Sequence, residues 1–378
     1  MDMEDMVPEG YPIEKHRVNT EDGWVLNMYR IPHGKYRNSQ PGPRPVVLLH
    51  HGITLSSACF ALLNANESMA YILADAGFDV WMANTRSNTF SRGNYNYSHR
   101  QSEYWYHSID EYGLIDLPAQ VNAALQVAGA KKLAIVGHSQ GCSVAYAMLS
   151  TMPEMNSRVS VVAHLGPVVF LDYFRAPFMR AMGEMRNDLY ARTAKIGEFL
   201  WYRFVAPYID VCRDYYNSEL CTAALNLIFF GPSMFITPDE TAVIFKTWPA
   251  SVSMRNVGHW AQMLTDGQLR FQRYDFGSNC GNLTNHEETC NQHRYGSMQP
   301  PEYDLSKVTA PQAFFAGELD LMATTEDILE QQRRLAPGVH AADYIYQSYS
   351  HMDFVWDRSA RYALDLVDLL FRYAPGTL

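Results

Sequence analysis

The chain has 378 residues, of which 47% are hydrophobic and 13% aromatic, and its formal net charge is −10 at pH 7. This length accommodates two average domains or one large α/β domain with an insertion. The negative charge argues against binding of nucleic acid or of anionic membrane surfaces, although not against neutral lipid. We expect no transmembrane segment, because the longest apolar candidate, residues 159–171, is interrupted by His164, Gly166 and Pro167.

The N-terminal residues 1–5 are acidic and lack the apolar segment of a signal peptide. We therefore expect either a cytoplasmic chain or the mature form of a secreted or lysosomal/vacuolar protein. Candidate glycosylation sequons at Asn66, Asn96 and Asn282 favour the second alternative, although such sequons also arise by chance.

Four of the six cysteines lie in close pairs, Cys212 with Cys221 and Cys280 with Cys290. Short loops of this kind suit local disulfides in an oxidising compartment. The alternative is that all six thiols are free.

Strand-like and helix-like segments alternate through the first half of the chain and again at its end. Strands are predicted at residues 45–49, 78–82, 133–136, 160–163, 311–315 and 342–346, and helices at 70–75, 116–127, 143–148 and 359–373. This alternation predicts an α/β fold with a mostly parallel central sheet and helices on both faces.

The sequence Gly137-His138-Ser139-Gln140-Gly141 directly follows the predicted strand 133–136 and precedes a helix. A G-x-S-x-G between strand and helix is typical of a nucleophile elbow. The glycines on either side of Ser139 leave room for the strand and the helix to approach each other. Such a turn lifts the serine Oγ above the sheet and aims the helix N-terminus at developing negative charge. The alternative is an ordinary turn with an incidental serine.

The alternation of strands and helices is interrupted between about residues 168 and 303, a stretch too long for one crossover connection. The stretch is rich in large apolar side chains: Phe170, Phe174, Phe178, Met179, Trp201, Phe204, Phe229, Phe230, Met234 and Phe235. Most must be ordinary core, but their excess favours an apolar substrate pocket. We expect a mainly helical cap or lid at 168–303, inserted into a core formed by 1–167 and 304–378.

A serine hydroxyl needs a general base, and the base needs an orienting carboxylate. In a fold of this kind the chain order is serine, acid, histidine, each at the carboxyl edge of a strand. Asp320 follows the strand at 311–315, and His351 follows the strand at 342–346, so both stand where this order requires. Other candidates remain open, namely Glu318 and Asp327 for the acid and His340 for the base.

An oxyanion hole requires two backbone N–H donors. We expect one from Gln140, which follows the nucleophile, and one from Ile53 in the loop His50-His51-Gly52-Ile53. The two histidines lack an accompanying carboxylate or cysteine cluster, so we expect no metal and no cofactor. Cys142 lies beside the elbow in the helix and is interpreted as a small packing residue.

Short blocks from about Tyr11 to Tyr373 resemble, in order, those of one family. They lie at residues 14–23, 29–32, 51–53, 72–81, 84–89, 110–112, 116–119, 137–141, 320–323 and 351–356. The pattern resembles the acidic lipases, the α/β-hydrolase group of gastric lipase and lysosomal acid lipase. The resemblance implies a triad of Ser139, Asp320 and His351, oxyanion donors at Ile53 and Gln140, and a cap with a lid that opens at lipid.

The resemblance also covers two smaller features and has three departures. Cys212 and Cys221 match the spacing of the family's cap disulfide, and Asn66 lies where the family carries a sequon. Ile53-Thr54-Leu55 stands where Leu and a small residue are usual, so we expect a different acyl pocket. Glu318-Leu319 replaces Gly-Asn or Gly-Lys, and the segment between Cys280 and Cys290 is an insertion.

These features predict a serine ester hydrolase for triacylglycerol and/or sterol ester, acting as a monomer or weak homo-oligomer. Each buried CH₂ contributes about 0.8 kcal/mol, so a long acyl chain would bind well beneath an apolar cap. The alternatives are a carboxylesterase or acyltransferase for other apolar esters, or a non-catalytic lipid-binding module. The complete set of candidate triad residues argues against the last.

Overall fold

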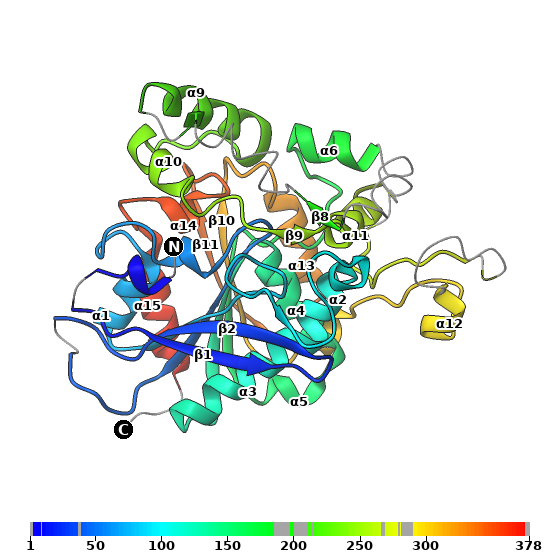
Figure 1. The fold of residues 1–378 in the computed structure, drawn as a ribbon, viewed down its shortest axis with the longest axis horizontal. Helices are drawn as coiled ribbons and strands as arrows, with labels where there is room; N and C mark the ends of the chain where they lie inside the picture. The colour runs from blue at the N-terminus through cyan, green and yellow to red at the C-terminus, as the bar shows by residue number, and fades with distance from the viewer. Residues whose placement is uncertain are drawn as a thin grey trace.

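A nine-stranded sheet forms the centre of the computed structural model (Figure 1). The structure describes residues 3–8, 10–36, 39–184, 197–199, 211–212, 215–265, 269–278, 280 and 290–374. The strands of the sheet are β1 (Glu14–Asn19), β2 (Trp24–Ile31), β3 (Val46–His50), β4 (Asp79–Met82), β5 (Gly93–Asn94), β6 (Leu133–His138), β7 (Val159–Leu165), β10 (Gln312–Gly317) and β11 (His340–Tyr346). Their order is β1-β2-β4-β3-β6-β7-β10-β11, and β5 pairs with β2.

The neighbouring strands β4, β3, β6, β7, β10 and β11 are parallel to one another. Each boundary of these strands lies within two residues of its predicted position. Every residue of β3, β6 and β7 is buried. Parallel strands that are covered on both faces have such continuous apolar runs. The predicted fold class is therefore confirmed.

The antiparallel hairpin of β1 and β2 makes the sheet mixed and was not predicted. Strand β1 is polar and only one of its residues is buried, so it carries little of the apolar signal that marks a strand. Arg30 ties the hairpin to the parallel strands, because its Nε and a terminal nitrogen each donate to Asp79 at 2.8 Å. Arg30 also donates to Glu14 across the hairpin at 3.0 Å.

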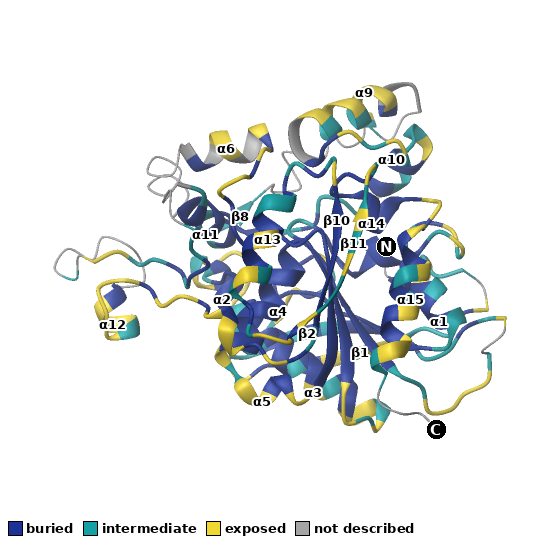
Figure 2. Ribbon diagram, turned by 180° about the vertical axis from the view of Figure 1, so that it is seen from behind, coloured by how far each residue is buried: buried dark blue, intermediate teal, exposed yellow. Residues whose placement is uncertain are grey.

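Helices cover both faces of the sheet, whose central strands are dark blue in Figure 2 because they are buried. The helices outside residues 168–303 are α1 (Met69–Ala76), α2 (Ile109–Glu111), α3 (Leu117–Ala128), α4 (Gln140–Thr151), α5 (Pro153–Asn156), α13 (Thr325–Arg334), α14 (Asp353–Trp356) and α15 (Tyr362–Tyr373). Helices α1 and α15 pack together on one face, and α3 and α4 pack together on the other. The last helix begins three residues later than predicted, because Ala360 has a φ of 45° and interrupts it.

Short 3₁₀ and π segments complete this part of the chain. The 3₁₀ turns are η1 (Met3–Asp5), η2 (Ser57–Phe60), η3 (Ser102–Trp105) and η6 (Leu305–Lys307), and the π-helix η4 (Tyr112–Asp116) leads into α3.

The segment between β7 and β10 is mainly helical where it is described. It contains α6 (Pro177–Glu184), α9 (Tyr215–Leu225), the π-helix η5 (Asn226–Phe230), α10 (Pro238–Ile244), α11 (Met254–Thr265), α12 (Asn291–Tyr295) and a small sheet of β8 (Glu198–Phe199) and β9 (Val252–Ser253). Figure 1 shows α6, α9 and α10 together at one end of the central sheet. Among the described residues, no helix is both long and apolar enough to span a membrane.

Both predicted cysteine pairs are disulfide-bonded, Cys212 with Cys221 and Cys280 with Cys290. Cys59 and Cys142 are free and buried. The Cys142 thiol donates to the carbonyl oxygen of Gly137 at 3.2 Å, in keeping with its expected packing role beside the elbow.

Candidate active site

Ser139 lies at a sharp turn between β6 and α4. Its φ of 56° and ψ of −122° place a non-glycine residue in a sparsely populated region of backbone space. Such strain costs on the order of 1–3 kcal/mol and persists only where the surrounding structure enforces it. The Ser139 N–H donates to the carbonyl oxygen of Leu165 on β7 at 3.0 Å, which holds the turn against the neighbouring strand.

The elbow needs glycine at three positions. A Cβ on Gly137 would lie 2.9 Å from the amide nitrogen of Cys142, and one on Gly141 would overlap the carbonyl oxygen of His50. A Cβ on Gly52, across the turn, would lie 2.8 Å from the Cβ of Ser139. The close approach of strand, helix and loop that the motif predicts is therefore present.

The structure brings Ser139, His351 and Asp320 together from separate loops. His351 Nε2 lies 2.8 Å from Ser139 Oγ, and His351 Nδ1 lies 2.8 Å from Asp320 Oδ2. A carboxylate only accepts hydrogen bonds, so Nδ1 carries a proton and Nε2 can accept the serine proton. All three residues are buried, with exposures of 3%, 2% and 3% respectively.

Backbone groups fix the acid and the base of this arrangement. Asp320 Oδ1 accepts N–H bonds from Met322 at 2.7 Å and from Ala323 at 2.8 Å. The His351 N–H donates to the carbonyl oxygen of Phe230 at 3.1 Å. The carboxylate and the imidazole are therefore oriented before any substrate arrives.

Two neighbours of this group were missed as functional positions. Gly166 has a φ of 52°, and a Cβ there would lie 3.0 Å from Asp320 Oδ2 and 3.2 Å from His351 Nδ1. His138 Nε2 donates to the carbonyl oxygen of His351 at 3.0 Å, and burial lowers the pKa of His138 to about 3, which keeps it neutral. The Gly-Pro pair at the end of β7 was the available signal for Gly166.

The other candidates for acid and base lie elsewhere. Glu318 is exposed, and Asp327 accepts from the Thr324 hydroxyl at 3.0 Å at the start of α13. Burial raises the pKa of Asp327 to about 6. His340 begins β11, at the opposite end of that strand from His351, and pairs with Asp343 at 3.0 Å.

Ile53 follows β3 and Gln140 is the first residue of α4, and both line the cavity beside Ser139. Within the described residues, neither backbone N–H donates to a protein acceptor. The loop before Ile53 is held by His51, whose Nδ1 donates to the carbonyl oxygen of Gly52 at 2.8 Å. His51 Nε2 accepts from the Thr85 N–H at 3.3 Å, and burial lowers the pKa of His51 to about 3, so the ring is neutral.

A small, partly open cavity lies beside Ser139. Its lining is almost entirely apolar and comprises Ile53, Ser139, Gln140, Val168, Leu171, Phe174, Trp260, Leu264 and Met322. Of the large side chains singled out in the sequence, Phe174 lines this cavity, whereas Trp201 and Phe204 and the side chains of Phe178, Met179 and Phe229 lie outside the described residues. Trp260, Leu264 and Met322 were not anticipated.

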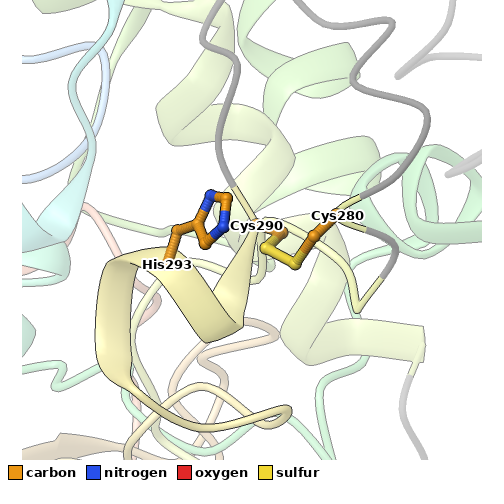
Figure 3. A group of neighbouring side chains, drawn as sticks. All are labelled: Cys280, Cys290 and His293. Carbon is orange, nitrogen blue, oxygen red and sulfur yellow. A yellow bond between two sulfur atoms is a disulfide. The ribbon is translucent and has the colours of Figure 1, made fainter.

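One cluster has the residue types of a metal site, Cys280, Cys290 and His293 (Figure 3). The two sulfur atoms are bonded to each other, so no thiolate is available and only the His293 imidazole remains as a ligand. A single imidazole does not make a zinc site.

Two of the three candidate glycosylation sequons lie among the described residues. Asn66 and Asn96 are exposed on loops of the core, so both are accessible to glycosylation. Asn282 lies outside the described residues.

Comparison with known proteins places the chain among lipases. Two family models match, a partial α/β-hydrolase lipase region at residues 3–64 and the α/β-hydrolase fold at residues 45–208. Lipase member K of Mus musculus is 35% identical over 93% of this chain and 85% of its own length. Gastric triacylglycerol lipase of Rattus norvegicus is 33% identical over 93% and 86%. Lysosomal acid lipase/cholesteryl ester hydrolase of Homo sapiens is 33% identical over 96% and 89%.

Solved structures agree on the fold. A putative aryl esterase from Burkholderia cenocepacia aligns with a TM-score of 0.54 at 13% identity, over 95% of this chain and 99% of its own. A thermophilic esterase from Thermogutta terrifontis aligns with a TM-score of 0.52 at 12% identity, over 96% and 100%. The coverage and identity of the curated relatives show that the chain belongs to the α/β-hydrolase lipase family that includes gastric and lysosomal acid lipases.

Proposed function

We propose that this protein is a serine lipase that hydrolyses neutral lipid esters through Ser139, His351 and Asp320. The observation that carries the proposal is the pair of 2.8 Å contacts that link Ser139 Oγ, the two nitrogens of His351 and Asp320 Oδ2. A serine on a strained elbow, an imidazole base and an orienting carboxyl group are the parts that acyl transfer requires.

The reaction proceeds in two halves. His351 Nε2 takes the proton of Ser139 as Oγ attacks the ester carbonyl carbon, and Asp320 stabilises the resulting imidazolium. The tetrahedral oxyanion accepts hydrogen bonds from the N–H groups of Ile53 and Gln140. As the intermediate collapses, the imidazolium protonates the departing alcohol. Water then attacks the acyl-enzyme with His351 as base, and the fatty acid and the free serine are released.

The substrate class follows from the cavity and the relatives. The side chains around Ser139 are mostly apolar and would favour contact with an acyl chain, because each buried CH₂ contributes about 0.8 kcal/mol. The relatives are named as triacylglycerol lipases and a cholesteryl ester hydrolase. We therefore favour triacylglycerol or sterol ester over short soluble esters.

We further propose that residues 168–303 form a cap over a core of residues 1–167 and 304–378. Val168, Phe174 and Trp260 from this segment line the cavity at Ser139, which supports a covering role. The two disulfides favour a secreted or lysosomal compartment, with glycans at Asn66 and Asn96. We expect a monomer or weak homo-oligomer that acts at a lipid–water interface.

The test is hydrolysis of triglyceride emulsions from C4 to C18, beside a cholesteryl ester and a soluble short ester, with Ser139→Ala as the blank. We expect long-chain turnover that disappears in the variant. Turnover of the soluble ester alone would contradict the lipase assignment, and turnover that survives Ser139→Ala would contradict the proposed nucleophile.

A further inference from the structure

The side chain of Gln140 accepts two hydrogen bonds from a single helix outside the elbow. Asn256 Nδ2 and Trp260 Nε1 each donate to Gln140 Oε1 at 2.7 Å. Asn256 and Trp260 are four residues apart on α11, so they share one face of that helix. All three side chains are almost fully buried. These bonds fix the residue whose backbone N–H is one proposed oxyanion donor.

The other proposed donor, Ile53, adjoins a residue that is held by the segment just before α11. Thr54 directly follows Ile53 and has a φ of 58°, which is an outlier for a β-branched residue. Trp248 Nε1 donates to Thr54 Oγ1 at 3.1 Å, and the Ala250 N–H donates to the Thr54 carbonyl oxygen at 2.6 Å. A strained conformation persists only where its surroundings enforce it, and here the surroundings are this pair of bonds.

Helix α11, which contacts Gln140, is itself fixed to the core. Ser253 Oγ donates to the carbonyl oxygen of His107 at 2.5 Å and accepts the N–H of Asn256 at 3.0 Å. The guanidinium of Arg255 lies 5.4 Å from the centre of the Tyr106 ring. The start of α11 is therefore a fixed point relative to the loop at residues 106–107.

We propose that residues 248–260, the oxyanion brace, position both N–H donors of the oxyanion hole, with Trp248 acting on Thr54 and with Asn256 and Trp260 acting on Gln140. This inference rests on the proposed ester hydrolysis. Oxyanion donors must lie about 2.7–3.1 Å from the developing charge, and a displacement of about 1 Å can lower the rate about 10²-fold. The brace is thus a positioning element of the oxyanion hole. When the cap opens for substrate, α11 must keep its hydrogen bonds to Gln140.

The test replaces hydrogen-bonding groups of the brace by apolar side chains. Asn256→Leu removes the amide donor at a residue that is not among those lining the cavity, and Trp260→Phe removes the indole donor. Thr54→Val removes the hydroxyl on the other side. Trp81→Phe on β4 is the matched control, because the buried Trp81 Nε1 has no hydrogen-bond partner among the described residues.

Each variant is assayed on a soluble short-chain ester and with a trifluoromethyl ketone of the same acyl chain, whose serine adduct carries an oxyanion. We expect Asn256→Leu and Trp260→Phe each to lower kcat about tenfold with little change in KM. Each should also lower the affinity for the ketone by a similar factor. Thr54→Val should act in the same direction, and Trp81→Phe should leave kcat and inhibitor affinity unchanged.

Thermal unfolding of each variant shows which of them are folded, and Trp260→Phe remains informative if Asn256→Leu unfolds. Folded variants with wild-type kcat would overturn the brace, as would a lower kcat with unchanged ketone affinity. Turnover by the wild type that is lost in Ser139→Ala tests the proposed function separately, so failure of the brace leaves that function standing. Absence of wild-type turnover would overturn both.

Discussion

The carboxyl edge of the parallel sheet and the face of α11 both contribute to the candidate site, but in different ways. The sheet edge supplies Ser139, Asp320 and His351 just beyond the carboxyl ends of β6, β10 and β11. Helix α11 supplies side chains that reach Gln140 from 116 and 120 residues away in the sequence. The first contribution follows from local chain patterns, whereas the second depends on tertiary packing. The reacting groups and the groups that position them therefore have different sequence patterns.

The largest expected effect lies at the sheet edge. Asp320→Asn should lower kcat about 10⁴-fold, because an amide cannot hold the imidazole in the tautomer that accepts the serine proton. The steady-state rate on a soluble ester measures this loss. Asp327→Asn is the matched control at another buried aspartate, and a similar loss in that variant would contradict the assignment of the acid.

Gly166 provides a test of how tightly the sheet edge fits its reacting groups. Gly166→Ala should lower kcat about 10²-fold, because the new methyl would press on Asp320 and His351. Gly129→Ala is its control, since Gly129 also has a positive φ, 65°, but its Cβ would meet nothing within 4 Å. Both variants should lose about 1–2 kcal/mol of stability from the backbone alone. Equal activities in the two variants would show that the contact at Gly166 has no role.

Buried histidines of the core should make the protein less stable in acid. Burial lowers the pKa of His50 and His164 to about 4 and of His51 and His138 to about 3. The unfolded chain, with histidine pKa values near 6.5, binds more protons, so stability falls as the pH falls from about 6.5 to 4. Burial raises the pKa of Asp327 and Asp353 to about 6, which opposes this trend because both become less costly when protonated.

His164→Phe isolates one of these histidines. His164 is stacked on Tyr146 and Phe314, so phenylalanine should keep the packing while losing the bond to Gln312. The variant should be less stable at pH 7 but should lose about 3 kcal/mol less than the wild type between pH 6.5 and 4. Urea unfolding at a series of pH values measures the difference, and parallel curves for the two proteins would refute the assignment.

The smallest effect is expected at the periphery. Replacement of both Cys280 and Cys290 by serine should leave kcat on a soluble ester unchanged, because neither residue lies among those around Ser139. The loop that the Cys280–Cys290 disulfide closes is short, so the loss of global stability should stay at or below about 3 kcal/mol. A fall in kcat at constant stability would instead connect this insertion to the site.

Much of this molecule could be predicted from its sequence because the signals are local. The apolar runs of β3, β6 and β7 and the glycines around Ser139 are short-range patterns with a direct physical cause. Strand β1 escaped because it is polar and mostly exposed along its length. The roles of Trp260 and Asn256 were not predicted, because a buried hydrogen-bond donor on an amphipathic helix has the same sequence pattern as an ordinary core residue. Gly166 stood in the sequence as an unexplained Gly-Pro after a strand.

The role of Ser139 as the nucleophile can be tested by labelling with a long-chain alkyl p-nitrophenyl phosphonate, followed by intact mass measurement and peptide mapping. We predict that one phosphonyl group attaches per chain, on the peptide that contains Ser139, and that Asp320→Asn slows the labelling strongly. Stoichiometric labelling at another residue, or undiminished ester hydrolysis by the fully labelled protein, would contradict Ser139 as the nucleophile.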